Sequence, residues 1–127
     1  MARYSLNFGA FEIDSLPSQC QVAVCHGFYV VTHLRGRGYG KELKSYQMHM
    51  LRLLQYDYAQ CTVVANNVAQ IKILKWAGWT KRDEFYSERQ GAVIEIWGTA
   101  IIGREKHDDV SRNKLHQDAC DQPAAGA

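Results

Sequence analysis

The amino-acid sequence predicts a single α/β domain with a mixed, mostly antiparallel sheet, and three observations lead to this prediction. Residues 21–32 are rich in β-branched and aromatic side chains, which favour a strand. Residues 40–55 carry apolar side chains at the spacing of an amphipathic helix, and a short apolar run follows at 61–65. A helix between two strands predicts a parallel βαβ unit, and the flanking segments alternate as antiparallel strands do.

The amino-terminal part is expected to supply one or two antiparallel strands. Residues 3–8 and 11–13 read as short β runs, which the turn-forming residues 14–18 would close. Within the strand segment that follows, Gly27 predicts a bend or a bulge, with strand on both sides of it.

The carboxy-terminal part is expected to add a helix and a hairpin. Residues 68–76 carry apolar side chains at helical spacing, and Gly78 supplies a helix stop. Residues 79–87 and 92–102 alternate as two strands joined by a polar turn. From residue 103 onward the composition becomes charged and small, so we expect a domain over 1–103 and a polar, partly disordered tail over 104–127.

Composition limits the classes of protein that fit. With 127 residues, of which 46% are hydrophobic, the chain has enough apolar surface for one core. A net charge of +2 is too small to indicate a general affinity for nucleic acid. The four cysteines lack a C-x-x-C spacing, and neither a signal peptide nor a membrane span is visible. We therefore expect reduced thiols and a cytoplasmic protein.

The most informative segment is the glycine turn, which we define as Arg35-Gly36-Arg37-Gly38-Tyr39-Gly40-Lys41. It leaves a predicted strand and opens a predicted helix. Such a turn presents backbone N–H groups at the positive end of the helix dipole, and this arrangement binds anions. The flanking basic side chains add positive charge.

Other glycine-rich motifs match this turn less well. A Walker P-loop needs Ser or Thr after Gly40-Lys41, where this chain has Glu42, and the dinucleotide fingerprint needs a third glycine where Lys41 stands. Residues 37–40 match the start of an RNA-recognition signature, but the segment that follows has helical periodicity. An RNA-binding domain and a plain solvated loop are the alternatives to an anion site.

Read as Arg35-x-x-Gly38-x-Gly40, the glycine turn resembles the acyl-CoA-binding motif of the GNAT superfamily of N-acetyltransferases. The order of elements from Cys25 to Ile102 resembles that family too, including a strand that ends near Asn67 and Gly78-Trp79 after the second helix. The resemblance implies a three-layer α/β/α fold whose mixed, mostly antiparallel sheet splays beside the glycine turn. It also implies acetyl-CoA as the cofactor.

By this resemblance, three groups of residues would bind the cofactor. The backbone of one strand would pair with the pantetheine arm, the glycine turn would hold the pyrophosphate, and one amide would lie near the pantetheine. In that order they are Phe28, Tyr29 and Val30; Arg35, Gly36, Arg37, Gly38, Tyr39, Gly40 and Lys41; and Asn67. The implied reaction is direct transfer of an acetyl group to an amine, which could be a protein lysine, an amino terminus or a small amine.

The general acid expected from the family is missing. Relatives often use a Tyr on the helix before Gly78, and counting back from Gly78 gives Leu74 at that position. Tyr86, Tyr39 or a water molecule are the remaining candidates for protonating the thiolate, and the sequence does not choose among them. This departure favours the alternative of a catalytically silent, GNAT-like binding or structural protein that retains coenzyme A.

The general base also departs from the family pattern. Many relatives carry a Glu on the strand before the motif, where this chain has Val24. His26 lies on the same side of an extended strand, and histidine exchanges protons near neutral pH, so it is the candidate base; the alternative is a half-buried structural histidine. Cys25 is a weaker candidate as an acyl-accepting nucleophile, because buried cysteines are commonly inert.

Only some 27 residues precede the strand of the motif, fewer than the family usually has. The wall of the acceptor site is therefore expected to be incomplete or rebuilt by the tail, the acceptor or a second copy, and the exposed core edge favours a homodimer. A short member of this kind would be at home in a phage or another mobile element. A nucleic-acid partner and a membrane are not expected.

Overall fold

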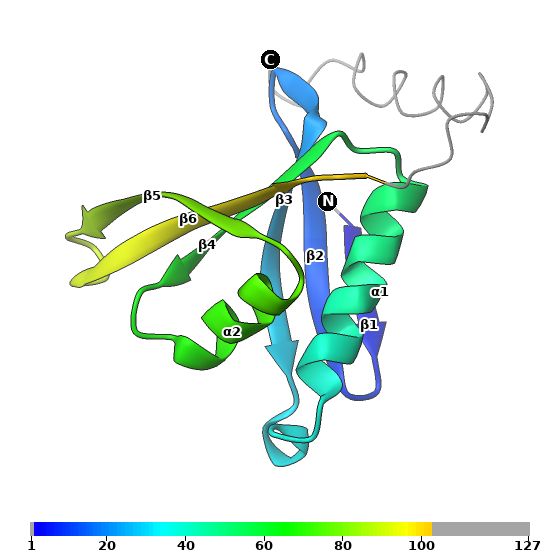
Figure 1. Ribbon diagram of the computed structural model, residues 1–127, viewed down its shortest axis with the longest axis vertical. Helices are drawn as coiled ribbons and strands as arrows, with labels where there is room; N and C mark the ends of the chain where they lie inside the picture. Colours follow the sequence, from blue (N-terminus) through cyan, green and yellow to red (C-terminus); the bar gives the residue numbers. More distant parts are fainter. Residues whose placement is uncertain (1, 103–127) are drawn as a thin grey trace.

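The computed structural model describes residues 2–102, which form one six-stranded sheet with two α-helices (Figure 1). The strands are β1 (Ala2–Leu6), β2 (Gly9–Leu16), β3 (Gln19–Val30), β4 (Tyr58–Val64), β5 (Thr80–Ser87) and β6 (Ala92–Ala100). The helices are α1 (Tyr39–Leu53) and α2 (Val68–Trp76), and a single 3-10 turn, η1, spans Thr32–Leu34. The predicted tail over 104–127 lies outside the described residues.

The sheet has the strand order β1-β2-β3-β4-β6-β5, and β3 and β4 are its parallel pair. This pair is short, because only Val22–Val24 are in register with Tyr58–Gln60. Beyond these residues the two strands diverge, and Figure 1 shows β4 turning away from β3 toward α2. The predicted α/β class, the βαβ unit and the splayed, mostly antiparallel sheet are confirmed.

The helices pack on the sheet through one continuous apolar core. Leu43 and Leu51 of α1 and Leu74 of α2 are fully buried, as are Phe11 of β2 and Ala59 of β4. Burying each large side chain contributes roughly 1.5–3 kcal/mol to folding, so the core holds α1 and α2 firmly beside the divergent strands.

Several boundaries differ from the sequence prediction, and two of them change how the sheet is built. Residues 14–16 belong to β2 rather than to a turn, because Asp14, Ser15 and Leu16 pair with Val24, Ala23 and Gln19 of β3. The reversal is made by Pro17 and Ser18 alone, and Ser18 adopts a φ of 69°. The predicted strand at 61–65 also begins earlier, at Tyr58, because it pairs with β6 from Ala100 onward.

The bend expected at Gly27 is a bulge inside one continuous strand. Ala10 pairs with Tyr29 and Glu12 pairs with His26, so two residues of β3 lie opposite Phe11. Gly27 has a φ of 64°, a conformation that glycine adopts without steric cost. Because the bulge lies after His26, His26 keeps the same side of the strand as Val24.

No helix among residues 2–102 has the length and apolar character that crossing a membrane requires.

Candidate functional site

A cavity of about 550 Å³ lies along the glycine turn; we call it the outer cavity. Its lining comes from the end of β3, the start of α1 and the first two turns of α2. The residues are Phe28, Tyr29, Val30, Arg35, Gly36, Gly38, Gly40, Lys41, Asn67, Ala69, Gln70 and Ile73. Residues predicted from sequence to lie together therefore surround one cavity. Two predicted residues do not line it: Arg37 is exposed, and the ring of Tyr39 packs 4.8 Å from that of Phe8.

The start of α1 opens into this cavity. Gly38 is the residue that precedes the helix, with a φ of 87°, and no side chain caps the helix there. The first backbone N–H groups of a helix have no partner within the helix, so they are available to a ligand. Gly40 allows α1 to approach α2, because a Cβ atom there would lie 2.6 Å from Cδ1 of Ile73.

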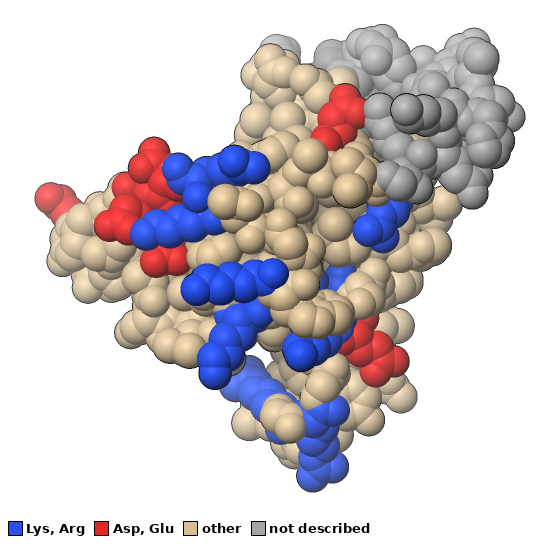
Figure 2. Space-filling view, viewed as in Figure 1, with Lys and Arg blue, Asp and Glu red and all other residues tan. Residues whose placement is uncertain are grey.

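Basic side chains surround the turn. Arg35 donates a hydrogen bond from Nε to the carbonyl oxygen of Val30 at 3.0 Å, which fixes its side chain beside the end of β3. Nζ of Lys41 lies 5.3 Å from the centre of the Trp76 ring of α2. Figure 2 shows Lys and Arg side chains gathered near the loop between β3 and α1, whereas Asp and Glu concentrate on the β5–β6 hairpin. The outer cavity is thus suited to an anion.

A second cavity of about 270 Å³ lies where β3 and β4 diverge, and we call it the fork cavity. It adjoins the outer cavity, because Phe28, Asn67 and Gln70 line both. Its other lining residues are Cys25, His26 and Gly27 of β3, Lys44 and Gln47 of α1, and Cys61, Thr62, Val63 and Val64 of β4. A long ligand held at the glycine turn can therefore extend into the fork.

The fork cavity contains two buried polar side chains that the sequence analysis did not single out. Lys44 and Gln47 are each 1% exposed, and Nζ of Lys44 donates to Oε1 of Gln47 at 2.7 Å. Burial lowers the pKa of Lys44 to about 8. Their spacing from Leu43 and Leu51 puts both on the buried face of α1, and this was the signal available in the sequence.

The surroundings of Lys44 are aromatic and sulfur-containing. Its Nζ lies 3.8 Å from the centre of the Trp79 ring and 5.3 Å from that of Phe28. Burial raises the pKa of Cys25 to about 12 and also raises the pKa of Cys61. Both thiols are therefore neutral near pH 7, which argues against Cys25 as a nucleophile.

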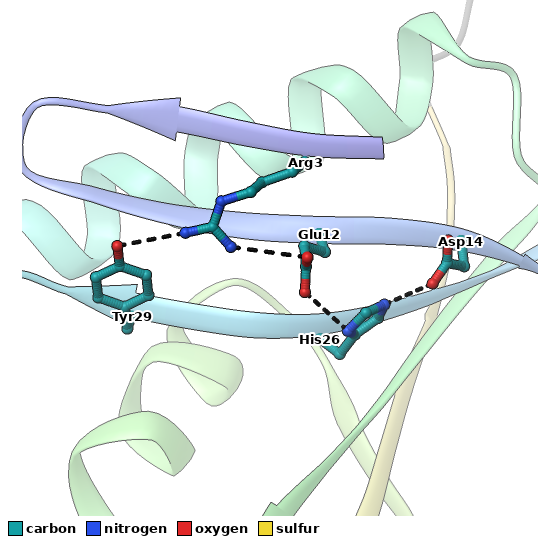
Figure 3. Close-up of polar contacts among 5 residues, drawn as sticks. All are labelled: Arg3, Glu12, Asp14, His26 and Tyr29. Atoms are coloured by element: carbon teal, nitrogen blue, oxygen red, sulfur yellow. Dashed lines mark hydrogen bonds and ion pairs between the residues drawn. The ribbon is translucent and has the colours of Figure 1, made fainter. Parts of the chain in front are cut away.

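His26 lies in a charged group that we call the His26 cluster, made of Arg3, Glu12, Asp14, His26 and Tyr29 (Figure 3). Nε2 of His26 is 2.6 Å from Oδ2 of Asp14, and its Nδ1 is 3.2 Å from Oε2 of Glu12. Arg3 extends the cluster, with Nη1 3.7 Å from Glu12 and Nη2 donating to the Tyr29 hydroxyl at 3.4 Å. Each ring nitrogen of His26 therefore faces a carboxylate oxygen.

The cluster brings carboxylates close to the position where the family would place a base. Asp14 is the cross-strand partner of Val24, and Glu12 is the partner of His26. Burial alone would raise the pKa of Asp14, but the hydrogen bond with His26 contributes to a net lowering. The sequence analysis missed both acids: it assigned Asp14 to a turn, and it did not predict which residue of β3 pairs with Glu12.

Neither the position at which the family resemblance places the acid nor Tyr86 supplies a hydroxyl to the fork. Leu74 is fully buried in the core, so the helix α2 offers no hydroxyl at that position. Tyr86 is on β5, is 63% exposed, and lines neither the outer nor the fork cavity.

A scan against protein-family models and a search of curated proteins each found no match. Solved structures of N-acetyltransferases do match the fold. One is the ribosomal-protein-S18-alanine N-acetyltransferase from Escherichia coli, with a TM-score of 0.65, 15% identity, and 81% of this chain and 69% of that chain covered. Another is a GNAT-family acetyltransferase from Streptococcus pneumoniae, with a TM-score of 0.65, 14% identity, and 76% and 63% covered.

A third match is a Bacillus subtilis acetyltransferase in complex with CoA, with a TM-score of 0.63, 11% identity, and 75% of this chain and 70% of that chain covered. Identities this low carry information on the fold. The protein therefore has the GNAT fold, as the resemblance of its sequence predicted, and it spans about two thirds of the length of these three structures.

Proposed function

We propose that the protein is an acyl-CoA-dependent N-acyltransferase, which moves an acyl group from coenzyme A to an amine. Acetyl-CoA is the simplest donor and the one that the sequence predicts. The observation that carries the proposal is the continuity of the two cavities: an anion site at the glycine turn adjoins a fork between two strands that no longer pair.

In this proposal each part of the cofactor meets one part of the site. The pyrophosphate binds the backbone N–H groups at the start of α1, with Arg35 and Lys41 adding charge. The pantetheine arm lies along the backbone of Phe28, Tyr29 and Val30. It uses the edge of β3 that faces away from β2, because β4 pairs with that edge only as far as Val24. Asn67, which caps the start of α2, would contact the same arm. The thioester then reaches the fork cavity.

The proposed reaction is a direct attack. The amine nitrogen forms a bond to the thioester carbon, the carbon–sulfur bond breaks, and coenzyme A leaves as a thiolate that takes up a proton. His26 is the proposed base, and the carboxylates of Glu12 and Asp14 would attract a cationic amine to it. Since Tyr39 packs on Phe8 and Tyr86 lies outside both cavities, we assign the proton of the thiol to water.

A second candidate function is a binding protein that holds coenzyme A without catalysis. One observation favours it: Leu74 is fully buried at the position where, by the family resemblance, a Tyr often supplies the acid. The homodimer and the cytoplasmic location stay predictions of the sequence.

Calorimetric titration with CoA and acetyl-CoA tests the proposal, followed by a panel of amines with detection of free thiol. We expect heat of binding and thiol release with at least one amine. Absence of heat at millimolar CoA would refute the cofactor site. Binding without thiol release on any amine would support the binding protein instead.

A further inference from the structure

Lys44 carries a charge that nothing in the described part of the chain neutralises. Within residues 2–102 no carboxylate forms an ion pair with it, and its hydrogen bond goes to a neutral amide oxygen of Gln47. A buried ammonium without a counter-ion is costly, since it has lost its hydration. The neighbouring cysteines do not help, because burial raises the pKa of both thiols and keeps them neutral.

A second donor beside Lys44 is unsatisfied. Nε2 of Gln47 is buried and has no hydrogen-bond partner among the described residues. Leaving such a buried donor unpaired is unfavourable, because it has lost its hydrogen bonds to water. Gln47 and Lys44 are three residues apart on α1, and both line the fork cavity. An uncompensated cation and an unpaired N–H donor at one cavity together match the requirements of a carboxylate.

We propose that the fork cavity binds an acyl group that ends in a carboxylate, so that the donor is a dicarboxylic acyl thioester of coenzyme A, of which succinyl-CoA is the simplest probe. The carboxylate accepts hydrogen bonds from Nζ of Lys44 and Nε2 of Gln47. An acetyl group also enters the cavity, but it leaves the charge of Lys44 unpaired. This inference rests on the proposed function, because the acyl group reaches the fork on the arm of coenzyme A.

The fork has room for such a group. Its volume of about 270 Å³ exceeds what one acetyl group fills, and the polar lining on the α1 side is limited to Lys44 and Gln47. The aromatic rings of Phe28 and Trp79 beside Nζ exclude water around the pair, which strengthens a charge-assisted hydrogen bond.

The test compares the affinities of CoA, acetyl-CoA and succinyl-CoA by calorimetry at pH 7. The wild type is compared with Lys44→Met, with Gln47→Met, and with the control Lys72→Met, which alters an exposed lysine of α2 that lines neither cavity. We expect the wild type and the control to bind succinyl-CoA about 10- to 100-fold more tightly than acetyl-CoA, the range that hydrogen bonds to a charged group supply.

Lys44→Met should abolish the preference for succinyl-CoA over acetyl-CoA, and Gln47→Met should reduce this preference. Equal affinities for the two thioesters in the wild type would overturn the inference while leaving the proposed function intact. A preference that survives in a folded Lys44→Met protein would overturn it as well. If none of the three cofactors binds, the proposed function and the inference both fail.

Discussion

Replacing Lys44 by methionine should make the protein more stable at neutral pH, and the gain should shrink in alkaline solution. Methionine has nearly the same length and fills the same space between Trp79 and Phe28, but it carries no charge. The substitution therefore isolates the free energy of holding an ammonium group inside the core.

The magnitude follows from the pKa of Lys44, which burial lowers from 10.5 to about 8. Between these two values the unfolded chain binds more protons than the folded one, so stability rises with pH across that window. The buried charge lowers the free energy of unfolding by about 3 kcal/mol at pH 7 and by about 1 kcal/mol at pH 10. The gain in the free energy of unfolding from Lys44→Met should thus fall by about 2 kcal/mol between pH 7 and pH 10.

Urea unfolding at pH 7 and pH 10 measures this difference. Lys72→Met, at an exposed position of α2, should show no such pH dependence. A stability difference between wild type and Lys44→Met that is the same at both pH values would refute the claim that Lys44 is a buried, ionised group.

Three further predictions concern binding and catalysis. Gly38 and Gly91 both have a positive φ and open space around them, so replacing either by Ala should cost ~1 kcal/mol of stability. Gly38→Ala should also weaken CoA binding measured by calorimetry. The control Gly91→Ala should leave the affinity for CoA unchanged. His26→Gln should lower the rate of acyl transfer by about 10²- to 10⁴-fold if His26 is the base, while the exposed His49→Gln should not; equal rates would exclude that role. The affinity for succinyl-CoA should fall by about tenfold from pH 7 to pH 9 as Lys44 loses its proton; a constant affinity would contradict the pairing.

The glycine turn could be predicted from the sequence because its geometry is local. A run of glycines between a strand and a helix fixes where backbone N–H groups are presented, whatever the rest of the chain does. Phe28, Tyr29, Val30 and Asn67 of the outer cavity followed from the resemblance to the GNAT family instead, and Ala69, Gln70 and Ile73 of α2 were not predicted. Arg37 and Tyr39 were included only because they belong to the motif.

The fork cavity could not be predicted in the same way, because its chemistry depends on tertiary packing. Polar residues between apolar ones in a helix usually face solvent, yet Lys44 and Gln47 face the core where β3 and β4 have separated. Likewise, Glu12 and Asp14 meet His26 only because β2 continues past Ile13 and pairs with β3 in one particular register. Contacts of this kind depend on register and burial, which short sequence patterns do not encode.

The divergence of β3 and β4 also explains how the two kinds of charge are kept apart. Successive side chains of a strand point to opposite faces, so Cys25 is buried near Lys44 while His26 meets Asp14 and Glu12 on the other side of β3. Under the proposed function, an anionic acyl group would approach the ammonium of Lys44, and a cationic amine would approach the carboxylates. Attraction between opposite charges favours this placement of the acyl group and the amine. Repulsion between like charges disfavours the reverse placement, with the acyl group at the carboxylates and the amine at Lys44. The thioester would then lie between the two faces, where the strands no longer pair.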